Sequence, residues 1–250
     1  AAAAFLFHLE KGASLSLTWK LSGGKEEGTC VLAAYYELAE DAKLHVSRLE
    51  SGLTKTVIYD QRHSVLAARA RADFYAAELG GEKIIVHSYG KLSGDASEMN
   101  ERAIYAGRGR QHLDFFYHID HVGKKTKAEI DLKGALADES KKIFRGTLDF
   151  KRGCAGSVGD EGDFAIQLDP KTKNISLPLL LCTEDDVQGN HASSAGQLDQ
   201  NTIYFLMSRG FTLEEARRIV VEALIRPIID GMDEALREEV LNAVRMKLDK

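Results

Sequence analysis

The sequence predicts a mainly β protein with a helical C-terminal domain, and three observations carry this prediction. Residues 5–150 alternate between apolar and polar side chains with a period of two, as half-buried strands do. Gly-containing turns interrupt this alternation at short intervals, with no helices in between, which excludes a doubly wound α/β fold. After Asp199 the apolar period changes to 3.6 residues. A sandwich, a barrel or a β-solenoid fits the strand region.

Strand-like alternation recurs at spacings that resemble the rungs of a solenoid. Proline is scarce there and no strict motif repeats, which favours a solenoid over the other two architectures. Segment 33–42 fits either a short helix or another strand. The expected strands cover residues 5–9, 14–20, 43–49, 54–59, 64–79, 83–89, 103–105, 111–121, 127–133 and 142–150.

Helix signals follow in sequence from Asp199. This residue can cap a first helix that Gly210 ends, and Thr212 with Glu215 forms the capping box of a second. Pro227 should interrupt or kink the second helix. A third amphipathic helix is expected over residues 233–247. The chain therefore divides into a β domain, residues 1–195, and a helical domain, residues 196–250.

Bulk properties limit the class of protein. The formal net charge of the 250 residues is -5, so a basic surface for nucleic acid or an anionic membrane is not expected. Apolar runs are too short for a membrane span, and no basic leader precedes the first one. Three widely spaced cysteines, Cys30, Cys154 and Cys182, favour a reducing compartment. We expect a cytoplasmic protein.

One expected strand, residues 111–121, carries an unusual polar face. Because successive side chains of a strand point to opposite sides, two imidazoles and two carboxylates share one face. Such a set could bind a transition metal or act as acid and base. A polar surface on which each imidazole bonds a neighbouring carboxylate is the simpler interpretation, and we favour it. The four residues are His112, Asp114, His118 and Asp120.

Four glycines within residues 153–162 do not form a phosphate-binding loop. Neither a Lys-Ser/Thr pair nor an expected helix follows them, so no P-loop or dinucleotide fingerprint is met. Hydrolase motifs such as Gly-x-Ser-x-Gly and His-Glu-x-x-His are absent from the sequence. We interpret this stretch as a flexible acidic connection, with Cys154 incidental.

The junction between strands and helices gathers possible metal donors. Cys182, Glu184 and His191 lie within ten residues of one another. Thiolate and imidazole are the donors of iron-sulfur and zinc centres, whereas a single Cys or His is more often structural. The residue types alone leave both readings open.

A longer pattern surrounds this junction. The run Glu184-Asp-Asp-Val-Gln-Gly-Asn-His-Ala-Ser-Ser-Ala-Gly-Gln-Leu-Asp199, followed by Ile203-Tyr-Phe-Leu-Met-Ser-Arg-Gly-Phe211, resembles the SufB/SufD family, and the SufD branch most. These proteins are scaffold subunits of the SUF iron-sulfur cluster assembly machine. Segments 105–114, 118–121 and 142–146 also resemble family segments, so the similarity covers most of the chain.

The resemblance implies a right-handed parallel β-helix core with flanking helices, and a role. Family members pair through their β-helices, bind the ABC ATPase SufC through C-terminal helices, and build a nascent cluster at the subunit interface. His191 corresponds to the SufD-type interface histidine, with Cys182 and Glu184 as further candidates for binding iron or the cluster. The resemblance places the ATPase-contacting helices at residues 199–229, with contacts at Phe211, Glu215, Arg218 and Pro227.

Departures from the family pattern point away from a complete SufB. The position of the SufB interface cysteine falls near Asp163, and Ala192 stands where SufB has a glutamate after its histidine. The chain is also short for the family, so two alternatives are expected: a trimmed SufD that pairs with a SufB-like subunit, or a member of a smaller assembly system in which a single such subunit pairs with itself.

Two functions from different classes are therefore expected alternatives. A scaffold would bind an ATPase and turn over no small substrate. A stand-alone β-solenoid enzyme, carbohydrate-active or metal-dependent, would use the face formed by His112, Asp114, His118 and Asp120. The helical tail favours the scaffold, because a solenoid hydrolase has no need of it.

Overall fold

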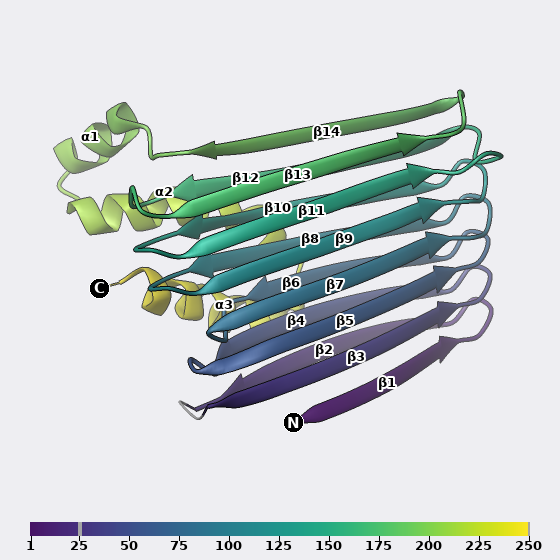
Figure 1. Ribbon diagram of the computed structural model, residues 1–250, viewed down its shortest axis with the longest axis horizontal. Coiled ribbons are helices and arrows are strands. Elements are labelled where there is room, and N and C mark those ends of the chain that lie inside the picture. Colours follow the sequence, from purple (N-terminus) through teal and green to yellow (C-terminus); the bar gives the residue numbers. More distant parts are fainter. Residues whose placement is uncertain (25–26, 250) are drawn as a thin grey trace.

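The computed structural model describes residues 1–24 and 27–249, and two seven-stranded parallel sheets form its core (Figure 1). The chain alternates between the sheets, so each pair of consecutive strands makes one turn of a β-solenoid. The fold class expected from the sequence is confirmed. Sheet A contains β1 (Ala2–Leu9), β3 (Gly28–Leu38), β5 (Thr56–Leu66), β7 (Lys83–Leu92), β9 (His112–His121), β11 (Lys141–Phe150) and β13 (Lys173–Cys182). Sheet B contains β2 (Ser14–Gly23), β4 (Lys43–Gly52), β6 (Arg71–Glu78), β8 (Glu98–Gly107), β10 (Lys127–Leu136), β12 (Ser157–Gln167) and β14 (Val187–Gly196).

Alternation determines which side chains fill the space between the sheets. On β9 the inward residues Leu113, Phe115, Tyr117 and Ile119 are buried, and they pack in one core with the inward residues of both sheets. The residues between them, Asp114, Phe116 and His118, face outward and are less buried. This period-two burial is the structural counterpart of the sequence alternation.

The turns formed by β4, β5 and β6 enclose charged side chains as well as apolar ones. Arg62 is buried and donates hydrogen bonds to Asp60 and Glu78, each at 2.6 Å. Arg48, also buried, pairs with Asp60. Buried charges require such partners, because an isolated charge in a low-dielectric interior is strongly unfavourable.

Three helices follow the last strand: α1 (Gln200–Ser208), α2 (Leu213–Asp230) and α3 (Glu234–Leu248). Asp199 caps α1, and the expected capping box of Thr212 and Glu215 begins α2. Pro227 was expected to interrupt or kink the second helix. It lies inside α2, which continues past it to Asp230 without interruption. Ile225, Ile228 and Ile229 are buried in a second core with sheet B, which holds this last turn of α2 in place.

Helices α2 and α3 pack on the outer face of sheet B, whereas α1 extends beyond the end of β14 (Figure 1). The second core joins Leu49, Leu79 and Ile104 of the sheet B side with apolar side chains of α2 and α3. The strands end at Gly196 and the helices begin at Gln200. No helix in the described part of the chain is long and apolar enough to cross a membrane.

Three sequence expectations about single segments are resolved by the strands. Segment 33–42 is mostly strand β3 rather than helix. The expected strand 64–79 is the end of β5 and all of β6, separated by a corner that includes Arg69. The presumed connection 153–162 was wrong in its second half, because β12 begins at Ser157. Gly159 lies on the inner side of β12, where a Cβ would come within 2.8 Å of the Leu148 side chain.

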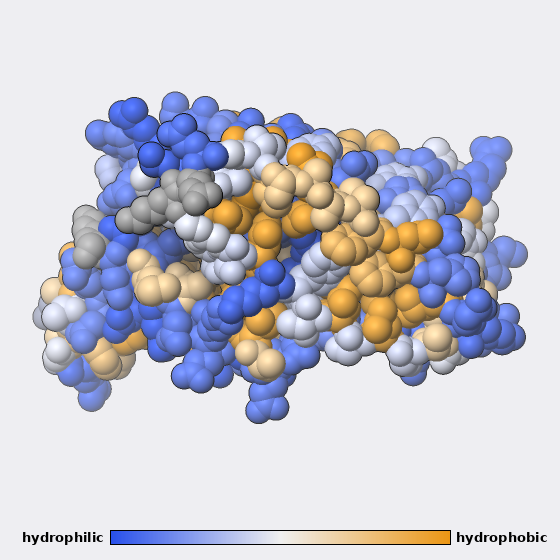
Figure 2. Space-filling model, turned by 90° about the horizontal axis from the view of Figure 1, so that it is seen from below, coloured by the Kyte–Doolittle hydropathy of each residue, from blue (hydrophilic) through white to orange (hydrophobic). Residues whose placement is uncertain are grey.

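In the described residues, no further element covers either end of the solenoid. Figure 2 looks at the end formed by the first turn and shows an apolar area there. The inward side chains of β1 and β2, among them Phe5, Phe7 and Trp19, have no turn beneath them and are partly or largely exposed. The opposite end, formed by β13 and β14, contains the junction residues of interest.

Candidate functional site

The last turn of the solenoid, β13 and β14, leaves inward-facing side chains open to solvent. Each of the two strands is the edge of its sheet in the described structure, so no further turn covers it. A lone edge presents unpaired backbone N–H and C=O groups that can pair with another chain. We refer to this surface as the open end.

His191 lies at the open end. It is the fifth residue of β14 and pairs in register with Glu161 of β12, which is an inward position. Strand β14 covers β12, so Glu161 is buried. Nothing in the described residues covers β14, so His191 is exposed. Its imidazole can therefore be reached from outside along the axis of the solenoid, as an interface ligand would have to be.

Glu161 is an unexpected group directly beneath this position. It is 3% exposed, and no described residue forms a hydrogen bond of standard geometry with either carboxylate oxygen. Gly146 of β11 gives it room, since a Cβ there would come within 1.8 Å of one oxygen. Burial, and after it the neighbouring Asp163, raise the pKa of Glu161 to about 8, against a smaller lowering effect of the Leu179 backbone amide.

Cys182 and Glu184 lie at one corner of the open end. Cys182 is an exposed free thiol at the last position of β13. The Glu184 carboxylate accepts hydrogen bonds from the backbone N–H groups of Gly153 at 2.8 Å and Asp185 at 3.1 Å, which lowers its pKa. Glu184 therefore stabilises the turn between β13 and β14.

These three predicted site residues do not converge within one chain. His191 lies four residues beyond Val187, the first residue of β14, and a strand rises about 3.3 Å per residue. Roughly 13 Å of strand therefore separates His191 from the corner where Cys182 and Glu184 lie.

Asp163, near which the resemblance places the SufB cysteine, is not an open ligand. It is buried on the inner side of β12 and forms an ion pair with Lys142 of β11. The Tyr105 hydroxyl also lies 3.2 Å from the Lys142 ammonium. This carboxylate is already neutralised by the chain itself.

An apolar stripe follows the outward face of β13, at the edge of sheet A. Its four large aliphatic side chains occupy successive outward positions and are between 40% and 54% exposed, so they form one contiguous apolar surface. Such a stripe on an edge strand is typical of a surface that another chain covers. Its members are Ile175, Leu177, Leu179 and Leu181.

The four residues predicted to contact an ATPase lie in two places: around the start of α2 and near its end. Phe211 is exposed just before the helix, Glu215 completes the capping box, and the Arg218 guanidinium lies 3.4 Å from the Asp249 carboxylate. Pro227 is twelve residues beyond Glu215, about 18 Å further along the helix axis. Tyr204, Phe205 and Met207 of α1 add exposed apolar surface beside the first group.

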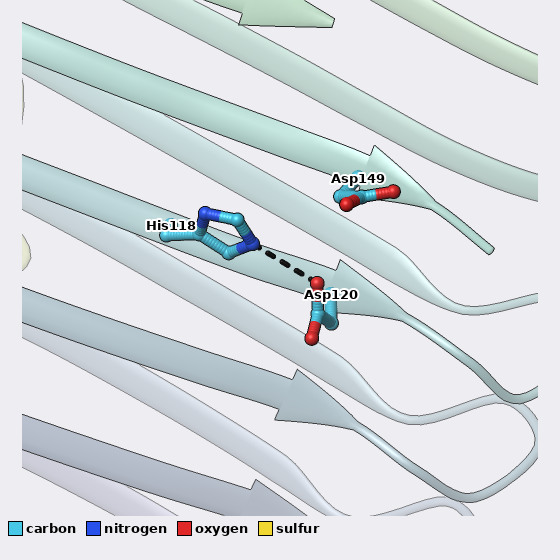
Figure 3. Close-up of side chains that lie close together, drawn as sticks. All are labelled: His118, Asp120 and Asp149. Carbon is cyan, nitrogen blue, oxygen red and sulfur yellow. Dashed lines mark hydrogen bonds and ion pairs between the residues drawn. The ribbon is translucent and has the colours of Figure 1, made fainter. Parts of the chain in front are cut away.

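The predicted face of His112, Asp114, His118 and Asp120 exists on the outer side of sheet A, but its members form two separate groups. Asp114 pairs with Arg145 of β11, and His118 bonds to Asp120 at 3.0 Å (Figure 3). Six residues, about 20 Å of strand, separate His112 from His118. The four side chains therefore cannot act on one small substrate atom together.

Glu161 and Asp149 were missed from the sequence. Glu161 belongs to a glycine-rich stretch that was interpreted as a connection, so its inward position was not recognised. Asp149 lies opposite Asp120 across β9 and β11, a pairing that only the register reveals.

Comparison with known proteins supports the same family. Residues 1–224 match the family described as "SUF system FeS cluster assembly, SufBD core domain". The chain is 27% identical over 204 residues to the iron-sulfur cluster assembly protein SufD of Bacillus subtilis, covering 81% of this chain and 46% of that relative.

Other relatives come from both branches of the family. The SufD protein of Escherichia coli is 20% identical over 210 residues, covering 83% of this chain and 50% of the relative. The SufB protein of Bacillus subtilis is 21% identical over 189 residues, covering 75% of this chain and 40% of the relative. The chain spans about half the length of the curated relatives it matches.

Proposed function

The chain belongs to the SufBD core-domain family of SUF iron-sulfur cluster assembly proteins, and on this premise we propose that it is a non-enzymatic scaffold subunit of such a complex. It pairs through its open end with a SufB-like subunit or a second copy of itself. It also binds a SufC-like ABC ATPase through α1 and the start of α2. Iron or a nascent cluster is held at the subunit interface as transient cargo.

The observation that carries this proposal is the exposed, inward-facing His191 on an uncovered last turn. Edge strands β13 and β14 offer backbone groups for pairing, and the apolar stripe on β13 offers surface to bury. A partner seated on this end would enclose His191 in the interface. The ligands that one chain lacks near His191 would then come from the partner.

Imidazole suits a ligand that must hold iron and later release it. It binds first-row metals through a neutral nitrogen and loses them on protonation. Cys182 and Glu184, about 13 Å of strand away, serve as a second contact at the corner of the same interface rather than as members of one ligand set. Three free cysteines in the described residues suit a reducing, cytoplasmic setting.

The ATPase contact is supported by the exposed apolar side chains around the α1–α2 connection. Tyr204, Phe205 and Phe211 gather there, next to the Glu215 capping box. Because α1 follows β14 directly, a force applied to this region reaches the open end through a short connection, residues 197–199. ATP-driven motion of the partner could open the interface in this way.

The test of this function is His191→Ala in the chain co-expressed anaerobically with a SufC-like ATPase and a SufB-like subunit. We expect normal folding and complex mass, with iron and acid-labile sulfide per complex falling to the level of a preparation without the chain. A matched control is Asn190→Ala, the neighbouring exposed residue on the outward side of β14. Wild-type iron and sulfide in the His191 variant would remove this residue from the site.

The alternative of a stand-alone solenoid enzyme has less support. Its predicted active face divides into Asp114 with Arg145 and His118 with Asp120, about 13 to 20 Å of strand apart. Relatives in both branches are named as assembly proteins. We therefore retain the scaffold as the proposed function.

A further inference from the structure

The outer face of sheet A carries a compact cluster of metal-ligating side chains away from the inward-facing His191. His118 and Asp120 come from β9, and Asp149 comes from β11. One ligand atom of each lies within 4.8 Å of the other two. Figure 3 shows the three side chains on the same side of the sheet, near the carboxyl ends of the two neighbouring strands.

The two carboxylates are held together in spite of their charge. Asp120 and Asp149 are directly opposite in the register of β9 and β11. Each is only 7% exposed, so water screens their repulsion poorly. Like charges directly opposite on one face of a sheet are destabilising, and burial of a charge adds to this. The arrangement therefore requires a cation.

Lys151 takes the place of that cation in the structure. Its ammonium lies 2.5 Å from Asp149 Oδ2 and 3.4 Å from Asp120 Oδ1, so one charge bridges both carboxylates. The lysine side chain is 43% exposed and can turn away into solvent. With a neutral His118, the two carboxylates give the cluster a formal charge of minus two. The Lys151 ammonium offsets one of these charges, whereas a divalent ion would offset both.

The spacing of the donor atoms suits one ion. His118 Nε2 and Asp120 Oδ1 are 3.0 Å apart. Two ligands at about 2.1 Å from a metal, at right angles to each other, are about 3.0 Å apart. The Tyr89 hydroxyl donates to the other oxygen of Asp120, and so orients this carboxylate as second contacts of metal ligands commonly do.

We propose that His118, Asp120 and Asp149 bind one divalent first-row transition metal ion, in competition with Lys151. One imidazole nitrogen and two carboxylate oxygens are donors for Zn²⁺, Fe²⁺ and Mn²⁺. The imidazole binds through Nε2, so its proton moves to Nδ1 and the present hydrogen bond to Asp120 is replaced by two bonds to the ion. The site does not depend on the proposed assembly function, because none of its three ligands lies at the open end.

The test uses the full chain carrying Cys182→Ser and His191→Ala, which removes the donors of the open end. Metal-free protein is titrated with Co²⁺ and followed by calorimetry and visible absorption. We expect one equivalent to bind, with ligand-field bands but no thiolate charge-transfer band. Asp149→Asn should weaken binding at least about tenfold.

Lys151→Gln should tighten Co²⁺ binding at least about fivefold, since it removes a competing positive charge a few ångströms from the ion. Lys133→Gln is the matched control. Like Lys151, Lys133 pairs with an aspartate two residues earlier in the chain, Asp131 at 2.7 Å, but this pair lies on sheet B, away from the proposed site. This control should leave the affinity unchanged.

Absence of Co²⁺ binding, or equal affinity in the Asp149→Asn protein, would overturn the site. Equal affinity in the Lys151→Gln and Lys133→Gln proteins would overturn the competition. Circular dichroism checks that each variant is folded. If Asp149→Asn is not, His118→Gln replaces it, with the same expected loss of at least about tenfold.

Discussion

The carboxyl group of Glu161, buried beneath the open end, should make the stability of the protein depend on pH. It is 3% exposed, and its pKa is raised to about 8 by burial and then by Asp163. The perturbation is Glu161→Gln, which keeps the shape of the side chain and removes its ionisation. Gly146 provides the same space for either residue.

The magnitude follows from the two pKa values. Glutamate titrates at 4.5 in the unfolded chain and at about 8 in the folded protein. Between these values the folded protein holds one proton more than the unfolded chain, so stability falls as pH rises, by about 1.4 kcal/mol per pH unit. The contribution is complete below pH 4.5 and is lost by pH 8. Between pH 5.5 and 7.5 the loss is about 2 to 3 kcal/mol.

Urea unfolding at several pH values measures this effect. The difference in pH slope between wild type and Glu161→Gln should correspond to about one proton, with an unchanged m-value. Glu101→Gln is the matched control, because burial raises the pKa of the fully buried Glu101 only to about 7. The pH range over which Glu101→Gln changes the slope of stability against pH should therefore end near pH 7, about one unit lower than for Glu161→Gln.

Parallel stability profiles for wild type and Glu161→Gln between pH 5.5 and 7.5 would refute this reasoning. They would mean that the carboxyl is ionised in the folded protein. A cation or water would then have to reach the carboxyl from the open end. Glu161 would in that case be more accessible to solvent than the structure indicates.

Two further predictions concern the interior. Lys142→Met should lower stability by about 3 to 5 kcal/mol, because it leaves the Asp163 carboxylate buried without its partner, and Lys142→Met with Asp163→Leu should recover most of this loss in urea unfolding. Equal instability of the single and double variants would contradict it. Burial lowers the pKa of His121 to about 4, so the wild type loses stability as pH falls from 6.5 to 4, and His121→Gln should flatten this acid limb by about one proton. An unchanged acid-unfolding profile by circular dichroism would count against it.

Side-chain alternation predicted most strands between residues 5 and 150, because every turn buries one face of each strand, whereas β12, β13 and β14 were not among the expected strands. The sequence pattern predicted one apolar face for residues 111–121, and its members are buried in the structure: Leu113, Phe115, Tyr117 and Ile119. Helix capping was equally local, and Asp199 and Thr212 cap the helices expected from them. Signals that depend on a few neighbouring residues were therefore reliable.

The corners between turns were harder to predict because they do not use one residue type. Successive turns place Asp41, Arg69, Ala96 and Lys125 at the same kind of corner, each with a positive φ. Their amides bond to carbonyls of the next turn, as Asp41 does to Ala68 and Arg69 to Asp95. Glycine is the usual residue in this conformation, so a corner formed by arginine gives no turn signal. The strand boundary at Arg69 was missed for this reason.

The candidate site was predictable only in part. His191 was found from its sequence context, but its exposure comes from being on an edge strand, which is a property of the whole sheet. Glu161 and Asp149 become neighbours of His191 and Asp120 through register across about 30 residues of chain. A single sequence does not contain that register.

Hydrogen exchange on β13 and β14 tests the central claim most directly. Amides of these two strands should exchange quickly in the isolated chain, because both are edges. In the complex with a SufB-like subunit, or in a dimer of this chain, we predict strong new protection across β13 and β14 and none on the outer face of β9. Unchanged exchange in β13 and β14, with protection appearing instead on the first turn or on β9, would contradict the account.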